Sequence, residues 1–386
     1  MANTFKFGNG EWAVGKETAL AYNDENSNFK PLAFTFDRST GATVVNKQGL
    51  IETVGTDEPR IDFLNNTKGH LLLEPSRQNV ITYSEDFSDS SWTKVNTTIT
   101  SNNTTSPDGT INATLCDYGS GSYINTGFAS TGDTDVTVSV FAKADSVSSL
   151  RIRESFYIGS SCVYDLNLGT ASAGGTIDNY GNGWYRCSFT YNLAAGQTNV
   201  NFIFDSNTQI GSLFLWGATC ELASYATSYI PTQGSAVTRS AESILIKGFQ
   251  DTILNGGDAP FALFIDFENY TLETLGDGLL FYDETDGTST EGRAYLYNSS
   301  AGFGQGWNDN PVSFTNNSSV KLLWNYTSLT EGYVWKDGTK GSLNSGTNAV
   351  DFDYLKIVSQ FNLLKINTIL IYNTALTDTE AQNLTS

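Results

Sequence analysis

Short stretches of the chain alternate between hydrophobic and polar residues. Residues 136–140 are Val-Thr-Val-Ser-Val, and the same alternation occurs at 200–204 and 261–267. A period of two is typical of a β-strand that buries one of its faces. Turn sequences such as Ser-Pro-Asp-Gly at 106–109 separate these stretches, and no convincing helical pattern occurs between residues 84 and 239. The pattern predicts an all-β fold built from β-sandwiches.

Three regions follow one another along the chain. Residues 1–83 hold short apolar runs separated by glycine and proline, which predicts an irregular, β-rich N-terminal region. Residues 84–239 predict a first sandwich, and a Ser/Thr-rich stretch at 234–243 leads into the third region, 240–386. That region includes a long late strand at 364–372 and predicts a second sandwich.

The end of the chain carries the signals of a short helix. Thr377 and Glu380 have the spacing of a capping box, in which each side chain binds the backbone N–H of the other residue. Ala381 and Leu384 would then lie on the inner face of the helix.

Charged residues make up only 16% of the 386 residues, against about 25% in a typical globular protein, and the net charge is −20. Such a charge repels nucleic acid and anionic membranes, whereas neutral glycans, cations and basic protein surfaces remain as partners. No apolar run reaches the ~18 residues of a membrane span. Residues 1–7 lack the features of a secretory signal, so we expect synthesis in the cytosol and no membrane insertion.

The four cysteines permit three pairings, and nothing in the sequence selects one. Without an export signal we expect buried free thiols at Cys116, Cys162, Cys187 and Cys220. The single histidine, His70, excludes zinc sites built on several histidines and is interpreted as a strand-edge or interface residue.

Several ordered phrases resemble the leading segment of structural proteins of tailed bacteriophages. They lie at 34–43, 46–51, 59–63, 73–77, 83–88 and Trp92, then at 183–186, 216–218 with Glu221, 227–232 and 238–239. In that family such phrases flank and close a jelly roll similar to carbohydrate-binding modules. Residues 369–380 resemble the end of a concanavalin-A/laminin-G-like sandwich.

The resemblance implies a fibre or decoration protein of the virion, on head or tail, that presents glycan-binding sandwiches to the host surface. Residues 1–83 would attach it to other virion proteins, 84–239 would be the jelly roll, and 240–386 the concanavalin-like sandwich. It further implies a homo-oligomer, with a trimer favoured, that is made in the host cytoplasm and located on the virion surface.

Paired charges are concentrated in the leading region of this arginine-poor chain. They are Asp37 with Arg38, Arg60 with Asp62, Glu74 with Arg77 and, further along, Arg239 with Glu242. Arginine binds carboxylates through two parallel hydrogen bonds, so we interpret the set as a structural ion-pair network. Docking onto a neighbouring virion protein is the alternative.

Aromatic rings flanked by amides are the residues expected to bind a sugar, since a ring stacks on the sugar's C–H face while amides bind its hydroxyls. The candidates are Trp307, Asn308, Asn310, Tyr295 and Tyr297. Weaker candidates are Tyr123, Tyr157 and Tyr180, whereas we expect Trp184, Trp216 and Trp324 in the core.

Phe264, Asp266 and Glu268 occupy the three positions where sandwich glycosidases carry a Glu-Asp-Glu set on one strand face. A retaining mechanism needs two carboxyl groups about 5 Å apart, and Phe264 stands at the position of the nucleophile. We therefore expect no enzyme and no catalytic residue, with that face partly exposed. Asp277, Asp283, Glu284 and Asp286 carry oxygens suited to Ca²⁺ but match no defined calcium loop, so we expect no cofactor and no metal.

The leading hypothesis is a non-enzymatic virion protein that binds host glycans. Two alternatives stay open: a virion-associated glycan depolymerase, either a glycoside hydrolase or a lyase, and a purely structural decoration protein without sugar binding.

Overall fold

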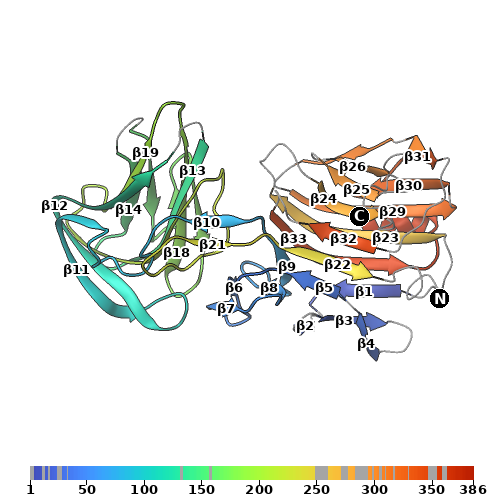
Figure 1. Cartoon of the computed structure of the whole chain (residues 1–386), viewed down its shortest axis with the longest axis horizontal. Helices are drawn as coiled ribbons and strands as arrows, with labels where there is room; N and C mark the ends of the chain where they lie inside the picture. The colour runs from blue at the N-terminus through green and yellow to red at the C-terminus, as the bar shows by residue number, and fades with distance from the viewer. Residues whose placement is uncertain are drawn as a thin grey trace. The chain divides into compact units, whose positions relative to one another are not determined.

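The computed structural model of the chain is drawn in Figure 1. It describes residues 4–10, 14–15, 18–23, 28–32, 34–130, 134–155, 159–247, 260–270, 277–282, 294–297, 300–303, 307–308, 310–315, 318–328, 330–346, 354–358 and 363–386. For part of these, including Tyr295, Tyr297, Trp307 and Asn308, the description covers the backbone alone.

Two compact units make up the fold. Unit 1 consists of residues 1–41, 54–76 and 240–386, and unit 2 of 42–53 and 77–239. The last segment of unit 1 begins at Ser240, inside the Ser/Thr-rich stretch that was expected to separate the second region from the third. Residues 1–83, expected as one leading region, are instead divided between the two units.

Unit 1 is a β-sandwich with a short C-terminal helix. Its elements are β1 (Thr4–Gly8), β2 (Val14–Gly15), β3 (Thr18–Asn23), β4 (Asn28–Leu32), β5 (Phe34–Asp37), β8 (Arg60–Asp62), β9 (His70–Leu73), β22 (Ser243–Lys247), β23 (Phe261–Tyr270), β24 (Asp277–Tyr282), β25 (Ala294–Tyr297), β26 (Ser300–Phe303), β27 (Trp307–Asn308), β28 (Val312–Ser313), β29 (Ser318–Ser328), β30 (Glu331–Lys336), β31 (Thr339–Gly346), β32 (Tyr354–Val358), β33 (Leu363–Tyr372) and α2 (Asp378–Thr385).

Among the described residues these strands form two sheets. One has the order β2-β3-β1-β33-β23-β29-β30-β31-β27 with β4, β9 and β8 attached beside it, and the other has the order β28-β26-β25-β24-β32-β22-β5. Strands from the leading region complete both sheets, because β1 and β9 pair with β33 while β5 pairs with β22. The leading region therefore depends on the last third of the chain for its fold.

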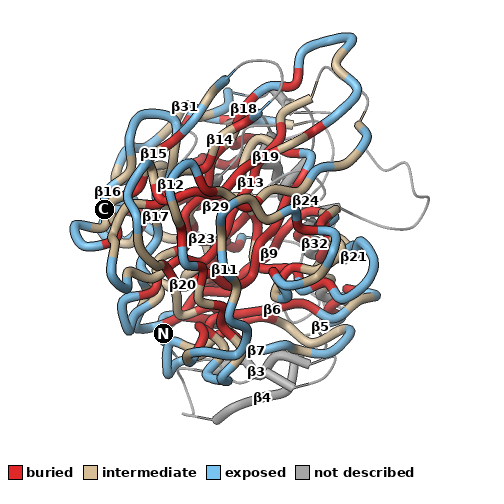
Figure 2. The backbone as a smooth tube through the Cα atoms, turned by 90° about the vertical axis from the view of Figure 1, so that its left-hand side faces the viewer, coloured by how far each residue is buried: buried red, intermediate tan, exposed pale blue. Residues whose placement is uncertain are grey.

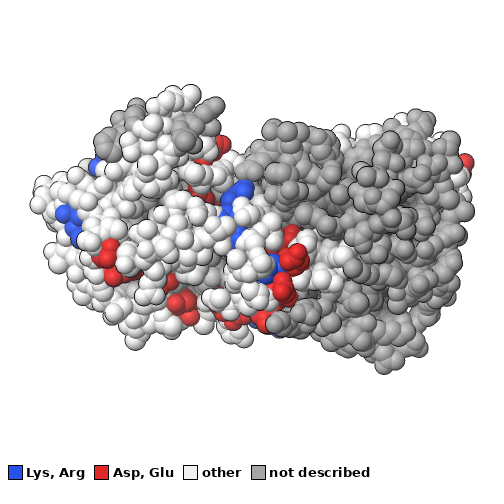
Figure 3. All heavy atoms as spheres, viewed as in Figure 1, with Lys and Arg blue, Asp and Glu red and all other residues white. Residues whose placement is uncertain are grey.

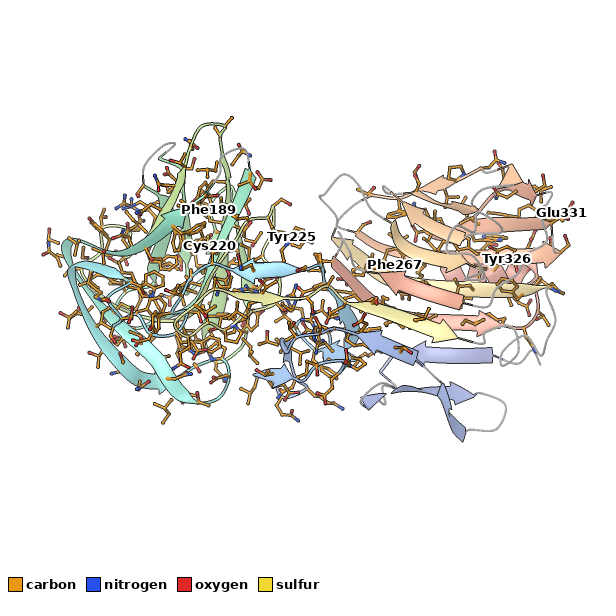
Figure 4. All side chains as sticks on the ribbon, viewed as in Figure 1. Phe189, Cys220, Tyr225, Phe267, Tyr326 and Glu331 are labelled. Carbon is orange, nitrogen blue, oxygen red and sulfur yellow. The ribbon has the colours of Figure 1, made fainter. Side chains whose placement is uncertain are left out.

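The core of unit 1 lies between its two sheets. Alternate residues of β23, from Phe261 to Phe267, are each 1% exposed and pack with Trp324, which confirms the predicted period of two. Phe267 and Tyr326 are labelled in this interior in Figure 4. The long late strand is also confirmed, as β33.

The second face of β23 is partly exposed, as expected, because Asp266 and Glu268 are half-buried, although it is covered at Phe264. Phe264 is only 4% exposed and packs with Leu323, Trp335 and Ala381, the last of which belongs to α2. The capping box that starts α2 is confirmed, because Thr377 accepts from the N–H of Glu380 and Glu380 accepts from the N–H of Thr377.

Unit 2 is a second sandwich. Its elements are β10 (Arg77–Asn79), β11 (Thr93–Thr105), β12 (Ile111–Ala129), β13 (Thr134–Ala144), β14 (Ser149–Glu154), β15 (Ser161–Asp165), β16 (Thr170–Ala171), β17 (Gly175–Asn179), β18 (Trp184–Leu193), β19 (Asn199–Asp205), β20 (Gly211–Glu221) and β21 (Val237–Arg239). A small sheet pairs β6 (Ala42–Val45) with β7 (Ile51–Val54), whose residues up to Thr53 belong to unit 2.

The main sheet of unit 2 has the order β16-β15-β14-β19-β12-β20-β13-β18-β17, with β11 beside β12. The 19-residue strand β12 pairs with β20 along its first half and with β19 along its second half. Inward residues of the strands on either side of β12, among them Val138 of β13 and Phe204 of β19, form one core. This core includes the four buried free cysteines. Cys220 and Phe189 are labelled in it in Figure 4.

The strand β13 is buried on both faces, whereas its alternation predicted one. Val136, Val138 and Val140 enter the core as expected, but Thr137 and Ser139 are 1% and 0% exposed. Thr137 donates to the carbonyl of Ala223, so the segment after β20 covers this second face. The polar residues tolerate burial because their hydroxyls find partners.

Three tryptophans are buried as the sequence predicted. Trp184, Trp216 and Trp324 are at most 2% exposed, as predicted for core residues. Figure 2 shows the buried backbone running along the strands and the exposed backbone at the turns. Within the described part of the chain, no helix is long and apolar enough to cross a membrane.

Candidate functional site

The residues expected to bind a sugar are placed in different sheets. Tyr295 and Tyr297 belong to β25, whereas Trp307 and Asn308 form β27 at the end of the other sheet of unit 1. The side chains of these four residues lie outside the described part of the structure, as do Tyr157, Asp283, Glu284 and Asp286 and the side chain of Asp277. Asn310 is exposed, but it binds inward: its backbone N–H donates to Asn344 Oδ1 and its Nδ2 donates to the Leu343 carbonyl, at 2.6 and 3.0 Å.

Four charged residues of unit 1 form a buried cluster, which we call the Glu242 cluster: Arg38, Arg60, Glu74 and Glu242. Glu242 accepts from Arg38 Nη1 at 2.7 Å, from Arg60 Nε at 2.8 Å and from Arg60 Nη2 at 2.5 Å. Arg60 Nη2 lies 2.9 Å from Glu74 Oε2, and the N–H of Glu74 donates to Glu242. All four side chains are at most 1% exposed.

The Glu242 cluster is a structural element. Arg38 also donates to the backbone carbonyls of Thr40 and Gly55, so it fixes the turn that follows β5. Burial alone would lower the pKa of Arg60, but Glu242 and Glu74 outweigh burial and raise it, so the guanidinium stays charged. These side chains are thus buried and bound to one another within the protein.

The other predicted members of the ion-pair set lie around this cluster or in unit 2. Asp37 is exposed, and Asp62 is buried, with its pKa raised by burial. Arg77 belongs to β10, and its guanidinium lies over the Tyr225 ring at 5.4 Å. His70, at the start of β9, is buried, and burial followed by Lys365 lowers its pKa to about 3. A neutral buried imidazole is unsuited to act as a general base on an external ligand.

A second buried cluster closes unit 2. Glu221 accepts from the N–H and the hydroxyl of Thr227, at 3.0 and 2.6 Å, and Arg239 donates to Thr227 and Ser228. Arg186 donates to the Thr227 carbonyl and to Ser139. Burial raises the pKa of Glu221, while Arg186 opposes the rise. The phrases that carry the family resemblance therefore meet in the interior of this unit.

The three strand positions compared with a sandwich glycosidase hold one buried aromatic ring and two half-buried carboxylates. Phe264 is packed beneath α2, and Asp266 accepts from Asn367 Nδ2 at 3.1 Å. In unit 2, Glu85 and Asp108 approach each other, since both accept from Asn112 Nδ2, at 3.2 and 3.3 Å. Among described residues, no group of three metal-ligating side chains is suited to hold a metal ion.

Glu85 and Asp108 are bound by the protein itself. Glu85 accepts from the Tyr229 hydroxyl at 2.8 Å, and burial raises the pKa of this carboxyl. Asp108 accepts from Ser106 Oγ and from the N–H of Thr110, so it fixes the turn at 106–109. That turn ends as predicted, with Gly109 at a φ of 85°, a conformation that favours glycine.

One face of unit 2 combines an aromatic ring with several polar groups directed outward. It is built where β12, β19 and β14 lie side by side: Asn125 is opposite Ile203, Ile203 is opposite Arg153, and Asp205 is opposite Arg151. Since side chains alternate along a strand, the polar and aromatic members of the outward set are Tyr123, Asn125, Arg151, Arg153, Asn201 and Asp205, and Ile203 lies among them. We call this set the Tyr123 face.

Hydrogen bonds fix the Tyr123 face. Asp205 is only 4% exposed and accepts from Arg151 Nε at 3.0 Å, from Arg151 Nη2 at 2.9 Å and from Arg153 Nε at 3.0 Å. The Arg153 guanidinium lies 5.7 Å from the centre of the Tyr123 ring, within the range of a cation–π contact. Asn125 donates to Asn201 at 3.3 Å. The arginine side chains remain 27% and 30% exposed, so solvent reaches the face.

Sequence reasoning found one member of this face, Tyr123, as a weak candidate, and missed the others. The signal was present in part, since 151–153 reads Arg-Ile-Arg and places two cations on one face of a strand. The sequence does not show which strands pair or in which register. The face joins strands that are about 30 to 80 residues apart in the chain, as the paired positions show. On the described surface in view in Figure 3, uncharged residues predominate over charged ones.

Comparison with known proteins gives similarity to solved structures alone. No protein-family model matches the chain, and none of the curated proteins matches it. The binding domain of botulinum neurotoxin DC in complex with rat synaptotagmin II is similar at a TM-score of 0.31 and 10% identity, over 38% of this chain and 40% of that one.

A structure on cell entry of botulinum neurotoxin type C, described as dependent on two ganglioside molecules, is similar at a TM-score of 0.30 and 8% identity, over 38% of this chain and 39% of that one. The receptor-binding domain of the C/D mosaic serotype is similar at 0.31 and 6% identity, over 37% of this chain and 40% of that one. The chain thus spans about 40% of the length of these structures. At such scores the likeness carries no argument about function.

Proposed function

We propose that the protein is a non-enzymatic structural protein of a phage virion, a fibre or decoration protein, that binds host-surface glycans through the Tyr123 face. The observation that carries the glycan-binding part is the geometry of that face. The virion part is supported by the phrases that resemble tailed-phage structural proteins, several of which meet in the two buried clusters.

The Tyr123 face has the chemistry that sugar binding requires. A tyrosine ring offers an apolar surface to the C–H groups of a pyranose, and the amides of Asn125 and Asn201 beside it bind hydroxyls. The face lies on three adjacent strands, so the positions of its side chains are fixed before a ligand arrives. If a single site binds weakly, many copies on one particle would convert weak binding into avid adhesion.

The non-enzymatic character is supported by the strand that would carry a glycosidase centre. Phe264 occupies the position of the nucleophile and is buried beneath α2, so no carboxylate stands at that position. The two carboxyl groups that approach each other, Glu85 and Asp108, are bound by neighbouring side chains of the protein. We therefore place the function in binding.

A glycan array with the purified chain tests the glycan-binding part. We expect binding to at least one surface polysaccharide, reduced at least ~fivefold by Tyr123→Ala, because stacking on one ring contributes on the order of 1 kcal/mol. Tyr225→Ala is the matched control: it removes another partly exposed tyrosine of unit 2, in contact with Arg77, and should leave binding unchanged.

Two further outcomes separate this proposal from its alternatives. Release of reducing ends from a bound polysaccharide would favour the depolymerase. Binding to no glycan, combined with presence in the particle by immuno-electron microscopy, would favour a purely structural decoration protein. Absence of the chain from purified particles would refute the virion role.

A further inference from the structure

The arrangement of guanidinium groups on the Tyr123 face points to a more specific ligand, and this inference rests on the proposed glycan-binding function. We propose that the Tyr123 face recognises a carboxylated sugar, a uronic or sialic acid residue, and that Arg153 binds its carboxylate. The argument depends on which donors of the two arginines are already used.

Arg151 and Arg153 differ in how they bind Asp205. Arg151 binds it through Nε and Nη2, a two-point contact that fixes its guanidinium. Arg153 binds it through Nε alone, and among the described residues neither of its terminal nitrogens donates a hydrogen bond. Those nitrogens form one end of a planar fork that matches the two oxygens of a carboxylate. Arg153 is thus oriented by the protein at one side and open at the other.

The local charge favours an anion in spite of the net charge of −20. Two arginines share the single carboxylate of Asp205, so the set carries a net charge of +1. Asp205 is nearly inaccessible, and its Oδ1 also accepts from the N–H of Asn207, so its charge is compensated within the protein.

Among the described residues, the acids Glu154 and Asp165 near the Tyr123 face are directed away from it or bound within the protein. Glu154 follows Arg153 directly but is 2% exposed on the opposite side of the strand. Asp165, at the end of β15, accepts from the N–H groups of Asn167 and Leu168 in its own turn. An approaching carboxylate therefore meets guanidinium groups first.

The aromatic ring beside Arg153 explains why the anion would belong to a sugar. The guanidinium of Arg153 lies within 5.7 Å of the Tyr123 ring centre, and a sugar acid carries its carboxylate on the ring whose C–H face stacks on an aromatic residue. Asn125, on the same strand as Tyr123 and opposite Ile203, supplies an amide for a hydroxyl. Tyr123, Asn125 and Arg153 thus lie on one face, where we expect one residue of the glycan to contact them.

The test compares matched acidic and neutral oligosaccharides by isothermal titration calorimetry with the full chain. The probes are a galacturonic acid oligomer against its carboxyl-reduced form, and sialyllactose against lactose. We expect at least one acidic probe to bind at least ~tenfold more tightly than its neutral partner, with a preference that falls as salt is added. Arg153→Gln should abolish the preference and keep binding to the neutral probe through Tyr123.

The controls separate the carboxylate from long-range charge and from folding. Lys47→Gln removes one positive charge from an exposed position elsewhere in unit 2 and should leave the preference unchanged. Arg153→Gln keeps the two-point contact of Arg151 with Asp205, and an unchanged melting temperature will show that the fold is intact.

Each outcome decides a different point. Equal affinity for acidic and neutral probes in the unmodified chain overturns the carboxylate inference and leaves the glycan-binding function standing. A preference that survives Arg153→Gln overturns the role of Arg153. Absence of binding to every glycan on the array and to all four probes refutes the proposed glycan-binding function itself.

Discussion

Replacing Glu242 by glutamine tests whether the Glu242 cluster holds unit 1 together. Glu242 accepts from Arg38, twice from Arg60 and from the N–H of Glu74, and both arginines are fully buried. Glutamine keeps the shape and one acceptor oxygen but removes the charge and turns the second oxygen into a donor. Arg60 would then keep its ion pair with Glu74, whereas Arg38 would lose its ion pair with Glu242.

The expected loss of folding free energy follows from the number of donors that Glu242 binds. Removing one partner of a buried ion pair costs roughly 3–5 kcal/mol, because an uncompensated charge stays in the interior. We expect Glu242→Gln in the upper part of that range, for three reasons. Two arginines lose the carboxylate of Glu242, the amide NH2 of glutamine faces other donors, and the N–H of Glu74 loses its acceptor. Glu331→Gln is the matched control, since Glu331 is exposed, and a surface change of this kind costs within about 0.5 kcal/mol.

The assay is urea denaturation read by hydrogen exchange and mass spectrometry, which follows peptides of the two units separately. Peptides from β5, β9 and β22 should lose protection at lower urea in Glu242→Gln than in the unmodified chain. Peptides from β13 and β20 serve as the internal reference for unit 2. A loss below about 1 kcal/mol in the unit 1 peptides would show that the cluster does not stabilise the fold, and the structural interpretation of these charges would be refuted.

Three further predictions concern single features. The pKa of His70 is lowered to about 3 in the folded chain, so the unfolded chain takes up the proton first as pH falls below about 6.5. Between pH 7 and 5 the unmodified chain should therefore lose about 2 kcal/mol more stability than His70→Leu, as measured by denaturation at both pH values. Thr377→Ala removes the hydroxyl that caps α2 and should cost about 1 kcal/mol in the same assay, with Thr339→Ala on exposed β31 as control; an equal effect of both changes would contradict the capping role. All four cysteines are buried, and burial raises the pKa of the Cys116 thiol to about 12, so a thiol reagent should label none of them in the native chain and all of them in urea; rapid native labelling would show that the core of unit 2 opens.

The sequence was most informative where a local period determines the structure. The alternation at 261–267 predicted the inward residues of β23, and the spacing of Thr377 and Glu380 predicted the cap of α2. Both features depend on residues within one strand or one turn, so neighbouring residues alone encode them.

Features that depend on distant parts of the chain were missed or placed wrongly. The alternation in β13 predicted one polar, solvent-facing side, but the segment after β20 crosses it and buries Thr137 and Ser139. Glu242 was paired in the sequence with its neighbour Arg239, whereas the structure has Glu242 accept from Arg38, 204 residues away. Neither the covering segment nor this partner leaves a periodic signal in the sequence.

The phrases that carry the family resemblance and the residues of the candidate site are separate sets. Arg38, Arg60 and Glu242's partner Glu74 lie in or beside such phrases, and so do Arg186 and Arg239, all of them buried. Tyr123, Arg153 and the other members of the Tyr123 face lie in none of them. Burial explains the separation, because an interior ion pair restricts the identity of each partner while an outward face on a strand accepts many side chains.

It follows that the resemblance is evidence about the fold. The ligand must be inferred from the Tyr123 face. A chain that shares the buried phrases but has other residues at the positions of Tyr123 and Arg153 should fold in the same way and bind a different glycan, or none. The two substitutions argued above separate these levels within one protein. Glu242→Gln should lower stability and leave the affinity of the folded chain unchanged, whereas Arg153→Gln should alter ligand preference at unchanged stability. If both substitutions changed stability, or both changed ligand preference, the residues for folding and the residues for recognition would not be separable. The Tyr123 face would then be rejected as the binding site.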